Sequence, residues 1–316
     1  MSRLPLVVTT ALLAVAPSLS ACGACGCTLH TDWASQGMSV APGFRLDLRF
    51  DFFNQDQLRS GRQRIPRSSL ELPNDQEVQQ QTLNRNTTVG LDYSPDGVWG
   101  FSCLLPIYDR THDTIAPGDT EVSSSRGAGL GDVRLLVRYQ GFREDRSVGI
   151  QVGVKLANGR TKDTFNGGPQ AGGALDRGLQ LGTGTTDLLL GVFASTTLGS
   201  NWGCFAQALY QLPGSEKDGF RPGPGLNVNA GLRRSGLGAF TPQLQLNLRT
   251  ERPETGDNAD RDNSGATLVY LSPGFTVRVA QGLHLSAFVQ VPVYQRVAGL
   301  QIEPRFLASG ALHWAF

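Results

Sequence analysis

The chain has 316 residues, with 28 Lys and Arg against 27 Asp and Glu, so its formal net charge is +1. This balance gives no long-range attraction to phosphate, which excludes a nucleic-acid partner. The 39 glycines follow no G-X-Y period, which excludes collagen. No run of about 18 apolar residues occurs, which excludes a helical membrane protein.

Residues 1–21 have the features of an export signal. Arg3 is the only charged residue among them, and the apolar stretch 4–16 is followed by small residues. This order is typical of a secretory signal peptide, because the apolar stretch is too short to cross a bilayer as a helix. The motif Leu-Ser-Ala-Cys ending at Cys22 resembles a bacterial lipobox, which implies lipidation of Cys22. Ordinary cleavage after Ser20 or Ala24 is the alternative.

Cys22, Cys25 and Cys27 follow the signal, with His30 close behind. Thiolates and an imidazole at these spacings can hold Cu(I) or Zn(II) as a metal site. A disulfide among the three cysteines is an equally strong alternative in an oxidising compartment. Covalent haem is excluded because Gly26 occupies the position of the required histidine. Apart from this metal, the sequence suggests no cofactor.

Apolar and polar residues alternate along most of the remaining chain. In residues 44–52, five large apolar side chains alternate with Arg45, Asp47, Arg49 and Asp51. On a strand this spacing separates an apolar face from a charged face, whereas on a helix the charges would surround the cylinder. The pattern predicts about twelve strands, most near the 9–11 residues that a tilted strand needs to cross a bilayer. They are 44–52, 85–94, 98–108, 133–140, 148–156, 185–196, 202–212, 225–234, 240–249, 266–279, 283–294 and 305–316.

Short and long connections alternate between these strands. The short turns are 94–97, 142–146, 198–201, 235–239 and 280–282. The longer linkers, rich in Gly, Asp, Asn, Arg and Pro, are 54–84, 109–129, 158–183, 213–224, 250–265 and 295–304, and the best helical candidate, 75–84, lies in the first of them. This asymmetry is typical of a bacterial outer-membrane barrel, whose short turns face the periplasm and whose long loops face outside.

The last predicted strand ends on an aromatic residue. Its apolar face carries Phe306, Ala308, Gly310, Leu312, Trp314 and Phe316. This pattern resembles the C-terminal signal of bacterial outer-membrane barrels, which implies that the barrel-assembly machinery is a partner that recognises the strand ending at Phe316.

These observations predict an all-β fold, a transmembrane antiparallel up-and-down β-barrel of about 12 strands in the bacterial outer membrane, in contact with its lipid. We expect a signal peptide at 1–21, a Cys-containing periplasmic segment at 22–42 and the barrel at 43–316. The barrel must close, because an open strand edge in hydrocarbon leaves backbone groups unpaired. A soluble barrel or sandwich with an apolar core is the alternative.

The polar face of each strand would then line the interior. The candidate pore-lining residues are Arg45, Asp47, Arg49, Asp51, Asp92, Arg134, Arg138, Lys155, Asp187, Gln207, Gln243, Gln245, Arg249 and Arg278. Either they border a water-filled path for a small-molecule solute, or they pair with one another and fill the interior. Twelve strands lie between filled barrels of about eight and open barrels of sixteen or more, so we expect a narrow or plugged conduit. The first long loop or the segment 28–42 can act as a gate.

Size, strand number and the C-terminal pattern resemble transporter-like outer-membrane barrels associated with phenol-degradation pathways. The resemblance implies a channel for small solutes, hydrophobic ones included. A non-conducting barrel that anchors a periplasmic redox or metal-handling partner through the cysteine cluster is the alternative. No enzyme activity or catalytic residue is expected. His284 and Ser286 share a strand face, but they face inward, unlike the lipid-facing residues of outer-membrane phospholipases.

Overall fold

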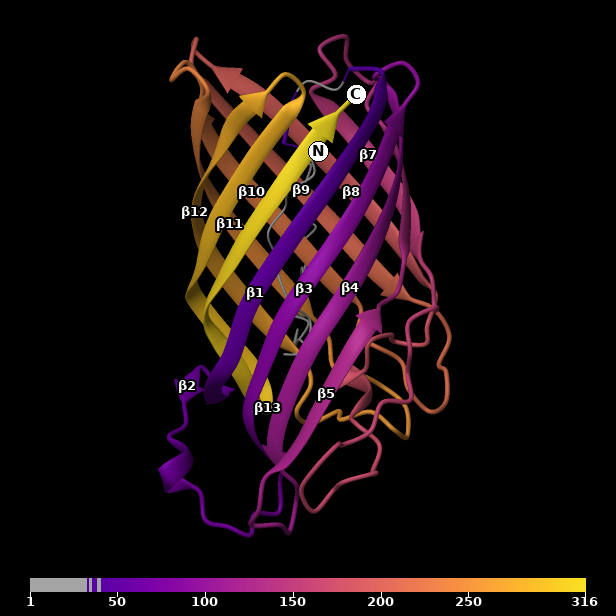
Figure 1. Cartoon of the computed structure of the whole chain (residues 1–316), viewed down its shortest axis with the longest axis vertical. Coiled ribbons are helices and arrows are strands. Elements are labelled where there is room, and N and C mark those ends of the chain that lie inside the picture. The colour runs from indigo at the N-terminus through magenta and orange to yellow at the C-terminus, as the bar shows by residue number, and fades with distance from the viewer. Residues whose placement is uncertain (1–32, 34–35, 39–40) are drawn as a thin grey trace, which may run out of the picture.

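The computed structural model describes residues 33, 36–38 and 41–316, which form an antiparallel barrel (Figure 1). The expected signal peptide, the lipidation site at Cys22, and the metal ligands Cys22, Cys25, Cys27 and His30 lie outside the described residues. The strands are β1 (Gly43–Gly61), β2 (Gln63–Arg64), β3 (Val78–Ser94), β4 (Trp99–Ile115), β5 (Ser123–Leu130), β6 (Arg134–Tyr139), β7 (Val148–Lys155), β8 (Asp187–Leu198), β9 (Trp202–Pro213), β10 (Gly225–Arg234), β11 (Phe240–Glu251), β12 (Ala266–Ala280) and β13 (Leu283–Ala315).

Helical structure in the described part of the chain consists of two single turns. They are the 3-10 segments η1 (Arg67–Ser69) and η2 (Arg177–Leu179), both in loops. No described helix has the length and apolar character needed to pass through a membrane.

The barrel closes where β1 pairs with β13, from Arg45 opposite Ala315 to Ser60 opposite Leu300. Eleven of the described strands form the ring, while β2 pairs only with β1 and β5 only with β4. β13 doubles back at Gly299: residues up to Val297 pair with β12, and the remainder pairs with β1. The wall therefore has twelve crossings, in agreement with the about twelve strands predicted from the alternation.

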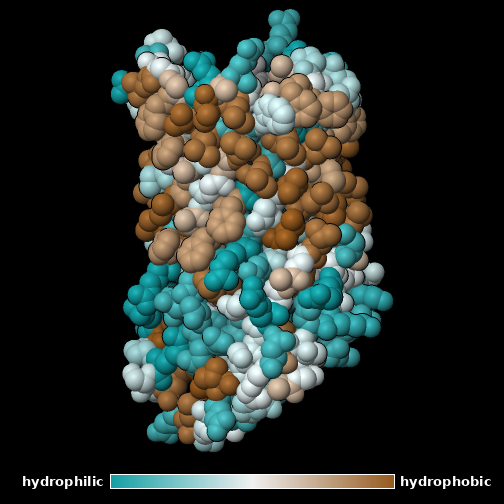
Figure 2. Space-filling model, in the orientation of Figure 1, coloured by the Kyte–Doolittle hydropathy of each residue, from teal (hydrophilic) through white to brown (hydrophobic). Residues whose placement is uncertain are grey.

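A belt of apolar side chains covers the outer surface of the wall. On the face shown in Figure 2, this belt occupies the half nearer the short turns, while the half nearer the long loops is largely hydrophilic. Soluble monomers rarely expose a contiguous apolar surface of this extent. Each crossing contributes residues to the belt, among them Leu48, Leu91, Phe101, Val137, Val152, Leu190, Tyr210, Leu232, Leu244, Leu271, Val291 and Leu312, all exposed.

The two ends of the barrel differ in loop length. Short turns at 95–98, 140–147, 199–201, 235–239 and 281–282 join strands at one end, where the C-terminus also lies (Figure 1). The longer connections 62–77, 116–122, 156–186, 214–224 and 252–265 lie at the other end. The predicted long linker 295–304 is wrong. A tight turn replaces it, and Gly299 adopts there a φ of 57°, which a residue with a Cβ rarely takes.

Strands β1, β3 and β4 extend past the belt on the long-loop side. Each has 17 to 19 residues, about 56–63 Å at roughly 3.3 Å per residue, which is more than the belt needs. The helical candidate 75–84 is therefore wrong, because Val78 and the residues after it belong to β3. The predicted linkers 54–84 and 109–129 are shorter for the same reason. Beyond the belt both faces of these strands meet polar surroundings. Their ends therefore lack the alternation of apolar and polar residues from which the other strands were predicted.

The belt predicts a depth-dependent cost for a buried charge. Leu244→Arg places a guanidinium at the centre of the outward run of β11, and we expect it to reduce the free energy of unfolding by about 2–4 kcal/mol. Leu237→Arg is the matched control, because Leu237 is as exposed as Leu244 (45% and 43%) but lies in a turn. Urea unfolding of vesicle-inserted protein measures both, and equal effects would contradict the belt.

Candidate functional site: the barrel interior

The predicted pore-lining residues lie on the wall face opposite to the belt. Most of them contact other interior side chains. Buried members are Arg45, Asp51, Asp92, Arg138, Lys155, Asp187, Gln207, Gln243 and Gln245. Asp47, Arg49, Arg134 and Arg249 are half-buried, and Arg278 is exposed near the short-turn end of β12.

Asp92 is the centre of an ionic cluster at the short-turn end. Its carboxylate pairs with Arg45 on one side and with Arg138 Nη1 at 3.3 Å on the other, and it accepts a hydrogen bond from Ser102 Oγ at 2.6 Å. The register brings these residues together: Asp92 lies opposite both Arg45 and Ser102, while Arg138 lies opposite Gly100. A side chain at Gly100 would overlap the Arg138 guanidinium, so this glycine gives Arg138 its space.

A second polar chain joins the two strands that close the barrel. His313 Nδ1 contacts the Asp47 carboxylate, and Nε2 lies 3.1 Å from Ser286 Oγ. The residue types are those of a hydrolase triad. Ser286 is only 3% exposed, however, so the chain holds β1 and both arms of β13 together and offers no accessible nucleophile.

The N-terminal segment enters the interior at the same end. The Trp33 ring packs against His284 and His313, with ring centroids 4.7 and 5.3 Å away. Arg233 on β10 donates hydrogen bonds to the backbone oxygens of Gln36 and Gly37, the latter at 2.7 Å. Trp33, Gln36 and Gly37 of the segment 28–42 thus lie inside the barrel, where the sequence suggests a gate.

Side-chain amides form a ladder midway along the wall. Asn247 Nδ2 donates to Asn229 Oδ1 at 2.7 Å and to Gln245 Oε1 at 3.2 Å, and Asn247 Oδ1 accepts from Ser272 Oγ at 2.5 Å. These residues face one another across β10, β11 and β12. Neutral donors and acceptors here satisfy each other without placing a charge in the middle of the barrel.

An apolar patch interrupts this polar lining. It consists of six buried residues from β1, β12 and β13: Phe53, Ala266, Leu268, Tyr270, Val297 and Leu307. The sequence alternation places Ala266, Leu268, Tyr270 and Leu307 inward, whereas Phe53 and Val297 lie outside the predicted strands. These side chains are only 1–4% exposed, so they pack against one another as a small apolar core inside the barrel.

A long loop covers the opposite end. Arg110 Nη1 on β4 donates to the Leu179 carbonyl of loop 156–186 at 2.9 Å. Lys155, at the end of β7, lies between the carboxylates of Asp132 (3.2 Å) and Asp187 (2.9 Å). Asp132 also accepts hydrogen bonds from the backbone and hydroxyl of Thr183, both at 2.8 Å. The Gly159 N–H donates to Asp132 at 2.9 Å, so the loop is fixed near both of its ends.

Three carboxylates, those of Asp176 in this loop and of Glu254 and Asp260, line a cavity of about 50 Å³, and the Glu77 carboxylate lies next to Asp176. Burial raises the pKa of Asp176 to about 7, with the negative charges of Glu77, Asp260 and Glu254 acting in the same direction. Burial also raises the pKa of Asp260. No group of His, Cys, Asp and Glu among the described residues is arranged to hold a metal ion.

Several of these residues were not candidates in the sequence. Arg110 lies inside a predicted linker, and Asp132 lies just before a predicted strand. Arg233 has the inward parity of β10, which the alternation alone can reveal, but its partner depends on a segment far away in the sequence. His313 shares the inward face of the last strand with Ser309 and Ala311.

No family model matches the sequence, and no curated protein is a recognisable relative of it. Among solved structures, an outer membrane channel from Pseudomonas putida F1 matches with a TM-score of 0.66 at 13% identity, covering 91% of this chain and 99% of that chain. The β domain of the Bordetella autotransporter Brka matches at 0.48 (13% identity; 87% and 100% covered). The toluene transporter TbuX from Ralstonia pickettii matches at 0.44 (10% identity; 88% and 90% covered). The match to the Pseudomonas putida channel shows that this chain shares its barrel fold, in agreement with the predicted β-barrel.

Removing the charge of Asp92 tests the ionic cluster. Asp92→Asn leaves Arg45 and Arg138 without this counter-charge in a buried position, so we expect a loss of about 3–5 kcal/mol in the free energy of unfolding. Asp96→Asn, in the exposed turn next to β3, is the control, because its amide oxygen can still accept the backbone hydrogen bonds of Val98 and Trp99. Unfolding in urea, followed by tryptophan fluorescence, compares the two variants, and similar losses would refute a special role for Asp92.

The carboxylate cluster predicts a pH effect near neutrality. The pKa of Asp176 is higher in the folded protein than in the unfolded chain, so its contribution to stability is complete at low pH and is lost as the pH rises through about 7. Ionised Asp176 then repels Glu77, Glu254 and Asp260, which loosens the loops. Trypsin should nick wild-type protein increasingly faster than Asp176→Asn between pH 6 and 8. The variant corrects for the pH dependence of trypsin itself, and a constant ratio of the two rates would contradict this view.

Proposed function

We propose that the chain is a bacterial outer-membrane β-barrel that acts as a passive channel or transporter for small solutes. The observation that carries this proposal is a closed wall whose exposed face is apolar and whose other face is ionic and polar. Hydrocarbon satisfies the outer face, and the closed ladder leaves no backbone group unpaired within it. The short turns then face the periplasm and the long loops face outside.

The proposed solutes are small molecules that combine an apolar body with a polar group. Arg45, Asp92 and Arg138 present charges of both signs near the periplasmic end, while Phe53 and Tyr270 belong to an apolar patch farther along. A purely ionic lining would bind a hydrophobic solute poorly, and a purely apolar lining would exclude a polar one. The predicted pore-lining set remains part of this proposal.

Both ends of the path carry a constriction. At the periplasmic end, Arg233 holds the backbone of Gln36 and Gly37 inside the barrel. At the outer end, Arg110 holds loop 156–186 at Leu179. Transport through this barrel therefore requires each constriction to yield or to leave a gap of the size of the solute.

The alternative role is a non-conducting barrel that anchors a periplasmic redox or metal-handling partner through Cys22, Cys25 and Cys27. It shares the fold and the membrane placement but predicts no conductance. Recognition of the last strand by the barrel-assembly machinery is common to both proposals. In the folded barrel, Phe316 exchanges two backbone hydrogen bonds with Phe44, at 3.0 and 3.1 Å, which complete the seam.

Planar-bilayer recording of the refolded mature protein tests transport. Arg233→Ala removes the donors that hold Gln36 and Gly37, so we expect a larger or more frequently open conductance than in wild type. Arg234→Ala is the matched control, because the neighbouring arginine instead stacks over Trp202 on the other face of β10 and should leave the conductance unchanged. Absence of conductance and of solute flux in all three proteins would reject the channel and favour the anchoring role.

A further inference from the structure

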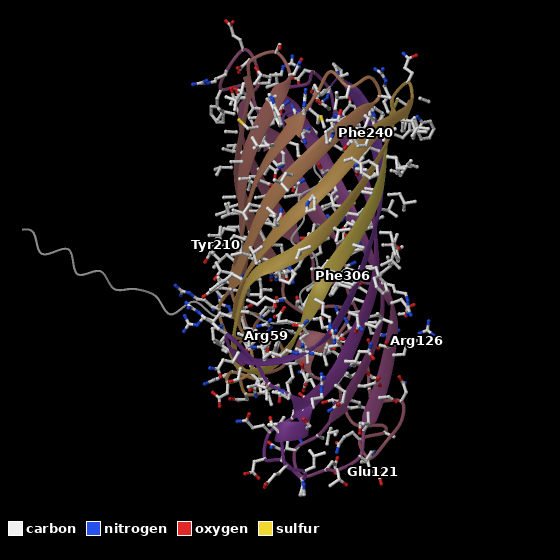
Figure 3. All side chains as sticks on the ribbon, turned by 90° about the vertical axis from the view of Figure 1, so that its left-hand side faces the viewer. Arg59, Glu121, Arg126, Tyr210, Phe240 and Phe306 are labelled. Carbon is white, nitrogen blue, oxygen red and sulfur yellow. The ribbon has the colours of Figure 1, made fainter. Side chains whose placement is uncertain are left out.

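The outer surface carries a groove at the level where the belt ends on the long-loop side. It has a volume of about 250 Å³ and is lined by Arg59, Arg62, Pro292, Val293, Tyr294 and Gln295. In Figure 3, Arg59 lies on the long-loop side of Phe306, a residue of the belt. In a membrane placed on this belt, the groove lies at the headgroup level of the outer leaflet. Any role of the groove toward lipid therefore rests on the proposed function.

The polar part of the groove is built by two guanidinium groups and a phenol. Arg62 stacks over the Tyr294 ring, 5.1 Å from its centroid, and donates from Nε to the Tyr294 hydroxyl at 3.2 Å. Arg59 Nη1 donates to the Arg62 carbonyl at 3.1 Å, which ties the two cationic residues together. The stacking fixes one face of Arg62 and leaves its terminal nitrogens available for an anion.

The groove is cationic, and its apolar side continues into the belt. Arg64 lies opposite Arg59 in the β1–β2 pairing, and Asp56 on β1 is paired with Arg305 at 3.1 Å. The buried Glu303 on β13 interacts electrostatically with Arg59, whereas Arg62 and Arg64 add positive charge. Below Tyr294, Val293 is 58% exposed, and Val291 and Val289 extend the same exposed apolar track. A ligand that fits both parts has an anionic head and an acyl chain.

We propose that this groove binds the phosphate headgroup of an outer-leaflet lipid, which in a bacterial outer membrane is a phosphorylated lipopolysaccharide. Arg59 and Arg62 bind the phosphate oxygens, the Tyr294 hydroxyl fixes Arg62, and an acyl chain lies along Val293, Val291 and Val289. Guanidinium groups suit this role because their planar donors match phosphate in pairs. Direct binding of lipid in this groove fixes the depth of the barrel on the side where β13 closes it.

The test titrates the detergent-solubilised, refolded full barrel with phosphorylated lipid A and measures the bound lipid by native mass spectrometry. The double variant Arg59→Gln with Arg62→Gln should lose roughly tenfold or more in affinity, since it removes two charge-assisted donor groups. Tyr294→Phe, which keeps the ring but not the hydroxyl, should give a smaller loss. Enzymatically dephosphorylated lipid A should bind wild type as weakly as phosphorylated lipid A binds the double variant.

Arg126→Gln is the matched control. Arg126 is 65% exposed, is paired with Asp109, and lies at a similar height to Arg59 on another part of the wall (Figure 3). If Arg126→Gln lost as much lipid affinity as the double variant, the groove would be overturned. Non-specific attraction between the anionic lipid and exposed arginines would then explain binding. Inorganic phosphate that displaces the lipid at equal concentration would overturn the lipid assignment.

The lipid-binding groove and the channel function can be tested independently, because different results would contradict each of them. The double variant should retain wild-type conductance, because Arg59 and Arg62 border the outer groove, not the path. Loss of lipid binding with normal conductance supports the groove as argued. Unchanged lipid binding in the double variant overturns the groove whether or not the barrel conducts, and a silent wild-type barrel that still binds lipid through Arg59 and Arg62 rejects only the channel.

Discussion

The structure depends on the closing ladder between β1 and β13. A sheet with one apolar face has stable arrangements in water as well, but a sheet surrounded by hydrocarbon has none unless its first and last strands pair. Here the pairing runs from Arg45 and Ala315 at the short-turn end to Ser60 and Leu300 at the other, so one seam satisfies both edges. A partial barrel is therefore unstable in the membrane. The backbone groups of the first strand stay unpaired until the last strand has formed its hydrogen bonds with them.

Closure places polar and charged residues in a narrow interior, and pairing among them offsets the cost of burying them. A buried charge is costly unless it is paired and hydrogen-bonded. The barrel meets this condition with cross-strand neighbours: Arg45 with Asp92, Lys155 with Asp187, and the neutral amides of Asn229 and Asn247. Since each contact joins adjacent strands, the interior network also fixes the register, which would shift every side chain to the wrong face if it slipped by one residue.

The sequence was sufficient to predict the strands in that part of the wall where one face meets an apolar medium and the other a polar one. Residues 44–52 and 240–249 alternate because one face meets an apolar medium and the other a polar one, so their strands and the short turns between strands could be predicted. Past the belt the contrast ends, and residues 53–61, 78–84 and 109–115 could not be distinguished from loops although they continue β1, β3 and β4. The register shifts in β1 near Gln55 also break the period, which turns Leu58 inward against its sequence parity.

Contacts between segments that lie far apart in the sequence could not be predicted for a different reason. The bond from Arg110 to Leu179 spans 69 residues and the bond from Arg233 to Gly37 spans 196, and neither end carries a local signal of its partner. Both contacts end on a backbone carbonyl, which every residue offers, so the identity of the accepting residue leaves no trace in the sequence. The wall is specified by its own alternation, whereas the segments that narrow it are specified by single guanidinium groups on the wall. A barrel of this kind can therefore change how its interior is narrowed by changing a few inward arginines, without changing the pattern that makes it close.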